Sequence, residues 1–260
     1  MVHSKQFSRL WVWAAFTLGM IAGCFWGVWQ FSGYFQTSSS LSSAPSVPQI
    51  YRITSLIGQP GENTTSSGSP SPLAYALRRE FPEVVATTRI FSETRMVGRY
   101  QDKVFIEEKI YRADEGFFGV FEFDVVKGQE YWALQEPYSV VMSTSCAKKY
   151  FGEVPKMGQA ISLDHQTYFL TGIVEDPKGI SPVEFDMLIS MSTHAGMQQN
   201  DNWGWNILNT YLRLGSQASP EALEARLPKV IEKYARPSMG DSYDQWLIRG
   251  GSLNYLLQAV

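Results

Sequence analysis

The stretch LWVWAAFTLGMIAGCFWGVWQF, from Leu10 to Phe31, contains no charged residue. A helix of about 22 residues, at ~1.5 Å per residue, crosses the ~30 Å hydrocarbon layer of a membrane. The rest of the chain holds no comparable stretch. The sequence therefore predicts one membrane-spanning helix over residues 10–31, which anchors a large soluble remainder and cannot form a transport path by itself.

Basic residues around the span predict its direction. Lys5 and Arg9 precede it, and the next basic residue is Arg52. Because Lys and Arg are enriched on the cytoplasmic side, residues 1–9 are expected in the cytoplasm and the bulk outside it. A cleavable signal peptide is the alternative, but its apolar core is usually only ~7–15 residues long. We expect a single-pass protein of the inner (cytoplasmic) membrane.

Small residues recur at every fourth position of the span, at Ala15, Gly19, Gly23 and Gly27. Residues four apart share one helix face, and missing side chains let a second helix approach closely. This ridge is predicted as a helix-packing face, on which a homodimer or the membrane helix of a partner would pack. The general abundance of Gly in membrane helices is the simpler alternative.

The composition of the remaining chain limits which structures and partners can be expected for it. A Ser- and Pro-rich stalk is expected over residues 32–49, and residues 50–260 suffice for two subdomains with cores of their own. The net charge of -3, without a basic run, argues against a nucleic-acid partner. Cys24 lies in the span and Cys146 in the domain, so no disulfide is expected within the exported part.

Strands and helices are predicted to alternate irregularly along the domain. Strands are expected over residues 50–54, 84–91, 103–111, 138–142, 159–163, 167–174, 185–191 and 209–214. Helices are expected over residues 72–81, around Phe117, over residues 144–150, and from Ser219 to Tyr234 with a bend at Pro228. Residues 58–71 are expected to form a loop. This mixture predicts an α+β fold in two subdomains, the second over roughly residues 139–235.

Short motifs follow one another in a fixed order along the domain. They are Ile50-Tyr51-Arg52-Ile53, Pro72-Leu73-Ala74, Glu80-Phe81-Pro82-Glu83-Val84, Ala113-Asp114, Phe117-Phe118-Gly119-Val120-Phe121, Ser139-Val140-Val141, Ala147-Lys148-Lys149-Tyr150-Phe151-Gly152, Gly172-Ile173-Val174-Glu175-Asp176-Pro177, Phe185-Asp186 and Asn209-Thr210-Tyr211-Leu212. In order and spacing they resemble the MacB-like periplasmic core domain of ABC transporter permeases of the MacB and FtsX type.

The resemblance implies two α+β subdomains outside the membrane, in permeases that work as dimers with a separate ABC ATPase subunit. It also implies that the domain lies between a first membrane helix and three later ones, which this sequence lacks. A shortened product, a split permease whose other helices are encoded separately, and an independent anchored partner all remain open. The sequence contains no G-x-x-x-x-G-K-[ST] motif, so ATP hydrolysis would fall to another subunit.

Residues that could carry catalysis are few in the exported part. His165 is expected in a hairpin turn, and His194 follows Ser192-Thr193 without a nucleophile motif of the G-x-S-x-G kind. Cys146 is expected in the first turn of a helix. We predict no catalytic residue and no cofactor, and a tethered periplasmic hydrolase is the remote alternative.

Metal binding is also not expected. Glu175, Asp176, Glu184 and Asp186 are spread over a loop that offers no His to complete a site. Surface positions, or hydrogen bonds between subdomains, explain these four acids more simply.

The segment Asn200-Asp201-Asn202-Trp203-Gly204-Trp205-Asn206 is the most unusual part of the domain. Trp203 and Trp205 are candidate contacts for a partner or the face of a sugar, as aromatic residues on loops can be. Packing of the loop onto the core is the commoner outcome for tryptophans of this kind. We therefore expect a non-catalytic extracytoplasmic domain that acts by protein contacts or mechanical coupling, or else an autonomous anchored binding or sensor module.

Overall fold

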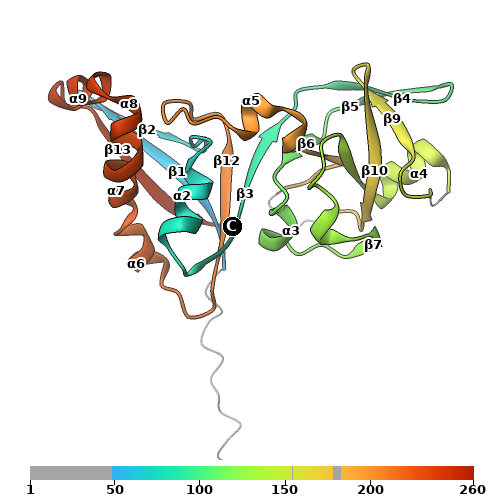
Figure 1. The fold of residues 1–260 in the computed structure, drawn as a ribbon, viewed down its shortest axis with the longest axis horizontal. Coiled ribbons are helices and arrows are strands. Elements are labelled where there is room, and N and C mark those ends of the chain that lie inside the picture. The colour runs from blue at the N-terminus through green and yellow to red at the C-terminus, as the bar shows by residue number, and fades with distance from the viewer. Residues whose placement is uncertain (1–48, 154, 178–182) are drawn as a thin grey trace, which may run out of the picture. The chain divides into compact units, whose positions relative to one another are not determined.

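The computed structural model describes residues 49–153, 155–177 and 183–260. Within them a sheet and several helices form a mixed fold of α and β elements (Figure 1). The predicted membrane helix over residues 10–31, with Ala15, Gly19, Gly23 and Gly27, lies outside the described residues. Residues 1–9 and 32–48 lie outside them too. None of the helices that are described is long and apolar enough to cross a bilayer.

The strands and helices follow one another in an irregular order. The strands are β1 (Ile50–Gln59), β2 (Glu62–Ser66), β3 (Val84–Ser92), β4 (Met96–Tyr100), β5 (Lys103–Glu107), β6 (Ile110–Ala113), β7 (Val125–Gly128), β8 (Ser139–Ser143), β9 (Ala160–Leu163), β10 (Gln166–Val174), β11 (Met187–Ser190), β12 (Asn209–Leu214) and β13 (Ser252–Ala259). The α-helices are α2 (Leu73–Glu80), α3 (Phe117–Val120), α4 (Thr144–Phe151), α5 (Ala195–Gln198), α6 (Pro220–Glu224), α7 (Leu227–Val230), α8 (Arg236–Met239) and α9 (Asp241–Ile248). Shorter 3₁₀ turns are η1 (Glu130–Trp132) and η2 (Met191–Thr193), and η3 (Ile231–Ala235) is π-helical.

One path of hydrogen bonds connects most strands, in the order β13-β1-β12-β3-β6-β11-β8-β10-β9-β4-β5. Two further strands lie off this path, β2 beside β1 and β7 beside β10. The pairs β6–β11 and β8–β10 are parallel, and the other described pairs are antiparallel. Strands from the two ends of the domain are neighbours, because β1 lies between β13 and β12.

Three hydrophobic clusters fill the fold. The first combines residues 51–84 with residues 203–255, and α2 and α6–α9 cover this part of the sheet (Figure 1). The other two take nearly all their residues from the chain between residues 86 and 189. We call residues 50–85 and 203–260 the terminal region, and residues 86–200 the central region.

Local signals placed several elements correctly. The Ser143 hydroxyl accepts a hydrogen bond from the Cys146 N–H at 3.2 Å and caps α4, which ends at Gly152 with φ +78°. Asp164 and His165 form the predicted hairpin turn between β9 and β10, with φ of +46° and +69°. Positive φ at both central residues is the requirement of a type I′ turn.

Two predictions about strands were wrong. The single strand over residues 103–111 is two strands, because β5 pairs with β4 while β6 pairs with β3 and β11. The loop over residues 58–71 contains the end of β1 and all of β2, which pair from Ser55 with Ser66 to Gln59 with Glu62. Gly61, at φ +88°, allows the tight turn between these strands.

The long helix predicted from Ser219 to Tyr234 is instead a series of short pieces. Ser219 caps α6 as expected, and its hydroxyl accepts from the Ala222 N–H at 3.1 Å. Pro228 stands in the first turn of α7 and Pro237 in the first turn of α8, where neither can donate a backbone hydrogen bond to a preceding helical turn. The π-helical turn η3 lies between them. The bend expected at Pro228 is therefore a break in the regular helix.

Candidate functional site

The loop over residues 200–206, which we call the Trp loop, is held by its own side-chain amides. Asn200 Oδ1 accepts a hydrogen bond from the Asn202 N–H at 2.9 Å, and Asn202 Oδ1 accepts from the Gly204 N–H at 2.8 Å. Such Asx turns fix a backbone without neighbouring strands. The unusual amide content of this loop thus has a local structural cause.

The base of the Trp loop is tied to the segment between β2 and α2. The Ser69 N–H donates to the Leu208 carbonyl at 2.7 Å, and the Ser69 hydroxyl donates to Thr210 Oγ1 at 2.7 Å. Gly68 approaches so closely that a Cβ there would lie 2.0 Å from the Asn206 carbonyl oxygen. This position needs glycine because a larger residue would push the loop away.

The two tryptophans of the loop have different environments. Trp203 is only 6% exposed, belongs to the first hydrophobic cluster, and stacks on Tyr234 with ring centroids 6.1 Å apart. Trp205 is 57% exposed. Trp203 therefore packs the loop onto the core, which is the commoner outcome expected from the sequence. Contact between Trp205 and a partner stays a prediction.

A groove of about 650 Å³, which we call the Trp groove, lies between the Trp loop, the helices α8 and α9, and β13. Its lining residues are Ile57, Asp201, Asn202, Trp203, Gly204, Asn206, Ser238, Met239, Ser242, Tyr243, Trp246 and Leu253. This volume falls in the ~300–1,000 Å³ range typical of small-molecule sites. The sequence identified the Trp loop, but it gave no signal for the α9 and β13 side of the groove.

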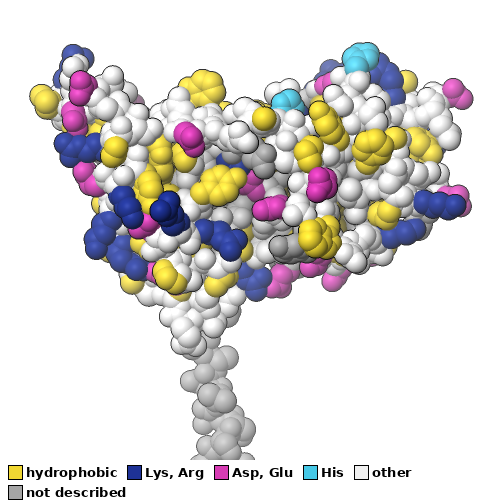
Figure 2. Space-filling model, viewed as in Figure 1, with side chains coloured by type: hydrophobic (Ala, Val, Ile, Leu, Met, Phe, Trp, Pro, Cys, Tyr) yellow, Lys and Arg dark blue, Asp and Glu magenta, His cyan; other side chains and the backbone are white. Residues whose placement is uncertain are grey.

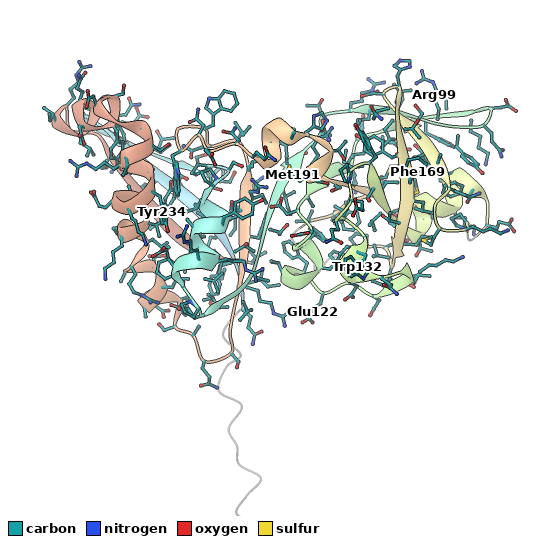
Figure 3. The ribbon with its side chains drawn as sticks, viewed as in Figure 1. Arg99, Glu122, Trp132, Phe169, Met191 and Tyr234 are labelled. Atoms are coloured by element: carbon teal, nitrogen blue, oxygen red, sulfur yellow. The ribbon has the colours of Figure 1, made fainter. Side chains whose placement is uncertain are left out.

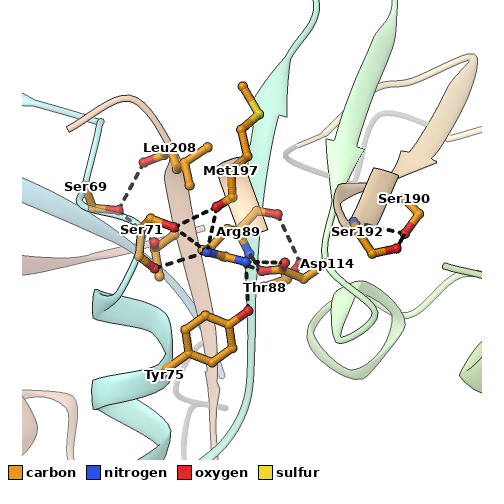
Figure 4. Close-up of polar contacts among 11 residues, drawn as sticks. Ser69, Ser71, Tyr75, Thr88, Arg89, Asp114, Ser190, Ser192, Met197 and Leu208 are labelled. Atoms are coloured by element: carbon orange, nitrogen blue, oxygen red, sulfur yellow. Dashed lines mark hydrogen bonds and ion pairs between the residues drawn. The ribbon is translucent and has the colours of Figure 1, made fainter. Parts of the chain in front are cut away.

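A buried arginine forms the second polar site, at the junction of the two regions (Figure 4). Arg89 of β3 is fully buried, and its Nε and Nη2 donate to Asp114 Oδ2 and Oδ1 at 2.7 and 2.8 Å. Nη2 also donates to the Tyr75 hydroxyl at 2.8 Å, and Nη1 donates to the Ser71 hydroxyl. A longer contact of 3.4 Å reaches the Met197 carbonyl.

We call this group the Arg89 joint, because its members come from both regions. Ser71 and Tyr75 belong to the terminal region, while Asp114 and Met197 belong to the central region. Burial would lower the pKa of Arg89, but the hydrogen bond and the charge of Asp114 outweigh burial, so the pKa ends above its ordinary value. Burial, and then the charge of Asp114, raises the pKa of Tyr75. Arg89 thus stays charged and Tyr75 neutral.

A cleft of about 410 Å³ opens beside the Arg89 joint. Tyr75, Arg78 and Arg79 of α2 line one wall, and Asp114, Glu115, Gln135, Met191 and Ser192 line the other.

Met191 lies near the middle of the view in Figure 3, and Tyr234 lies on the helices of the terminal region. Basic side chains gather over these helices (Figure 2), and Lys233 and Arg226 pair there with Glu80 and Glu83.

The three residues weighed for catalysis lie apart. His165 stands in the β9–β10 turn, and His194 is exposed just before α5. Burial, and then the charge of Arg112, lowers the pKa of His194. Cys146 is buried in the first turn of α4, and burial, followed by the charge of Glu107, raises the pKa of its thiol. A thiol in this state is a poor nucleophile.

The four acids considered as metal ligands make separate contacts, and the backbone N–H of Glu175 donates to the Asp124 carbonyl at 2.9 Å. Asp176 Oδ1 accepts from the Ser145 N–H at 2.8 Å near the start of α4, and Glu184 pairs with Lys109 at 3.1 Å. The Asp186 backbone bonds to Ser143 and Lys109. Within the described part of the chain, no group of three or more His, Cys, Asp or Glu side chains is arranged to hold a metal ion.

Sequence reasoning missed the Arg89 joint. The available signal was a single charge inside the β-type stretch Ala86–Phe91, followed by Asp114 directly after another strand. A charge in a buried strand requires a partner, because an isolated buried charge is too costly.

Comparisons with known proteins relate this chain to one family and to two solved structures. The family described as MacB-like periplasmic core domain matches residues 20–230. A domain assigned to a permease of Porphyromonas gingivalis shares the fold with a TM-score of 0.70 at 23% identity, over 83% of this chain and 91% of that one. The periplasmic region of MacB from Actinobacillus actinomycetemcomitans matches with a TM-score of 0.55 at 14% identity, over 82% and 98%. The search of curated proteins found no match.

Proposed function

Because this chain belongs to the family of MacB-like periplasmic core domains, we propose that it is the non-catalytic extracytoplasmic part of an ABC permease-type assembly. In this proposal residues 10–31 anchor it in the inner membrane, with residues 1–9 in the cytoplasm and residues 32–49 as a stalk. It acts through protein contacts, or by mechanical coupling, with a separate ABC ATPase subunit and permease helices. The division into two subdomains, the second over roughly residues 139–235, is part of the proposal.

The observation that carries the proposal is the position of the two ends of the domain. The Val260 N–H donates to the Ile50 carbonyl at 3.1 Å, and β1 and β13 pair from Tyr51 with Ala259 to Gly58 with Ser252. Segments joined to either end would leave the domain at one place. Such a pair of strands suits a domain that is mounted on membrane helices and moved by them.

The Arg89 joint supports mechanical coupling. Hydrogen bonds from Arg89 to Ser71 and Tyr75 tie the terminal region, which contains β1 and β13, to the central region, and a bidentate ion pair with Asp114 holds Arg89 in place. Bidentate pairs between arginine and a carboxylate hold geometry as well as charge. A displacement of the β1–β13 end would therefore be passed to the central region instead of being absorbed between the regions.

Purification from native membranes tests the assembly. We expect the chain to copurify with an ABC ATPase subunit in a complex whose ATP hydrolysis is inhibited by orthovanadate. A photoreactive residue at Gly23 should crosslink to a second copy or to a permease helix. Ile21 is the control, because two residues turn a helix by about 200° and place it on the opposite face. Equal crosslinking from both positions would exclude the Gly ridge as a packing face.

The tethered hydrolase is the alternative to be excluded. Replacing His194 and Cys146 by alanine should leave every activity of the complex unchanged. If the purified chain alone turned over a substrate, and these replacements abolished the turnover, the non-catalytic proposal would fail.

A further inference from the structure

We propose that the Trp groove binds a neutral saccharide. The inference goes beyond the proposed function and does not depend on it, because binding needs neither an ATPase nor a membrane partner.

An aromatic surface forms one wall of the groove. Gly251 packs against Trp246, since a Cβ on Gly251 would lie 2.3–2.5 Å from Cε2, Cδ2 and Nε1 of the indole. Nearly equal distances to three ring atoms place Gly251 over one ring face. Trp246 also lines the groove, beside Tyr243 at 5.5 Å between ring centroids. Flat rings with a negative face attract the C–H groups that one side of a pyranose ring presents.

Neutral polar groups face this wall. Asn202, Asn206, Ser238 and Ser242 all line the groove. Side-chain amides and hydroxyls offer donors and acceptors together, which suits sugar hydroxyl groups because each of those both donates and accepts.

Asn206 has an unused acceptor. Its Oδ1 is buried and has no hydrogen-bond partner among the residues that the structure describes. Such a group is costly unless something satisfies it. A ligand hydroxyl in the groove can donate a hydrogen bond to Asn206 Oδ1. Because this oxygen has no partner in the described part of the fold, no existing hydrogen bond of that atom is lost.

Charge narrows the class of ligand. None of the described residues that line the groove is Lys, Arg or His, and Asp201 is the carboxylate among them. Phosphates and acidic sugars would meet no cation here and would approach a negative charge. A neutral sugar fits both the rings and the amides without that repulsion.

Calorimetric titration of the full-length chain, kept free of sugar-based detergents, tests the proposal. The probes are an oligosaccharide of N-acetylglucosamine, one of glucose, and an acidic one of galacturonic acid. We expect saturable binding of at least one neutral probe, at least about ten-fold tighter than binding of the acidic probe. No binding of either neutral probe up to about 10 mM would overturn the proposal, as would preference for the acidic probe.

Two variants of α9 locate the site. Ser242→Trp fills the groove from an exposed position, and Gln245→Trp adds the same side chain at an exposed position outside the lining. We expect Ser242→Trp to weaken binding at least about ten-fold and Gln245→Trp to leave it unchanged. Because both positions are exposed, both variants should fold. Equal binding by the two variants would place the sugar elsewhere and refute the assignment.

Discussion

The Arg89 joint and the Trp groove are both rich in polar groups, but they differ in how folding satisfies them. At the joint, Asp114, Tyr75 and Ser71 all bond to the guanidinium of a fully buried arginine. At the groove, Asn206 Oδ1 has no partner among the described residues. A closed network holds two regions together, whereas an unsatisfied group beside an opening is available to a ligand.

The largest effect is expected where the joint is broken. Asp114→Ala leaves Arg89 charged and buried without its carboxylate, which should lower the free energy of unfolding by ~3–5 kcal/mol in urea titrations. The matched control is Glu184→Ala, which breaks an exposed pair with Lys109 and should cost ~1 kcal/mol or less. Equal losses in the two variants would mean that the ion pair with Asp114 does not stabilise the Arg89 joint.

The two tryptophans give a matched pair on the groove side. Trp203→Ala removes a buried ring from the first hydrophobic cluster and should cost ~3–5 kcal/mol of unfolding free energy. Trp205→Ala, at an exposed position, should change it by ~0.5 kcal/mol or less. A large loss from Trp205→Ala would assign that ring to the core and remove it as a contact for partners.

A smaller effect is expected at the wall of the groove. Gly251→Ala would place a methyl group 2.3 Å from the Trp246 ring, so the ring must shift. We expect a cost of ~1–3 kcal/mol, measured by urea unfolding, together with weaker saccharide binding. Unchanged binding by the folded variant would show that the position of Trp246 does not matter to the ligand.

The smallest effect concerns Tyr255 and depends on pH. Burial, and then the neighbouring Tyr243, raises the pKa of Tyr255. The folded state therefore keeps this proton longer than the unfolded state does, so the stability it contributes is full below pH ~10 and is lost as the pH rises above that.

Tyr255→Phe should remove this part of the alkaline loss. At pH 7 it should be neutral or stabilising by up to ~1 kcal/mol, because the hydroxyl that it deletes has no partner in the described part of the fold. Unfolding curves at pH 7 and above pH ~10 measure both effects. A loss at pH 7 would show that the hydroxyl is hydrogen-bonded after all.

Elements with strong local signals could be predicted from the sequence. The α4 helix has its Ser143 cap and Gly152 end, and the β9–β10 hairpin has its Asp164-His165 turn. The division between β5 and β6 could not be predicted, because Glu108 and Lys109 alone do not indicate that the two halves pair with different strands. Such pairing is a long-range property that alternation of residues does not encode.

The candidate sites follow the same pattern. The Trp loop could be identified because its aromatic and amide residues are adjacent in sequence, whereas the Arg89 joint combines residues from Ser71 to Met197. The other wall of the groove comes from α9 and β13, which were not predicted. Burial of Trp203 depends on Tyr234, which lies 31 positions further along the chain.

Membrane topology is the most direct test of the central claim, that the domain lies outside the cytoplasm. In a Cys24→Ser background, where the remaining Cys146 is buried, one cysteine is introduced either at Ser4 or at exposed Gln245. Cells whose outer membrane has been permeabilised, but whose inner membrane is closed, are treated with a membrane-impermeant maleimide. The account predicts that Gln245→Cys is labelled before the cells are lysed and Ser4→Cys only after lysis. Protection of Gln245→Cys until lysis would contradict it.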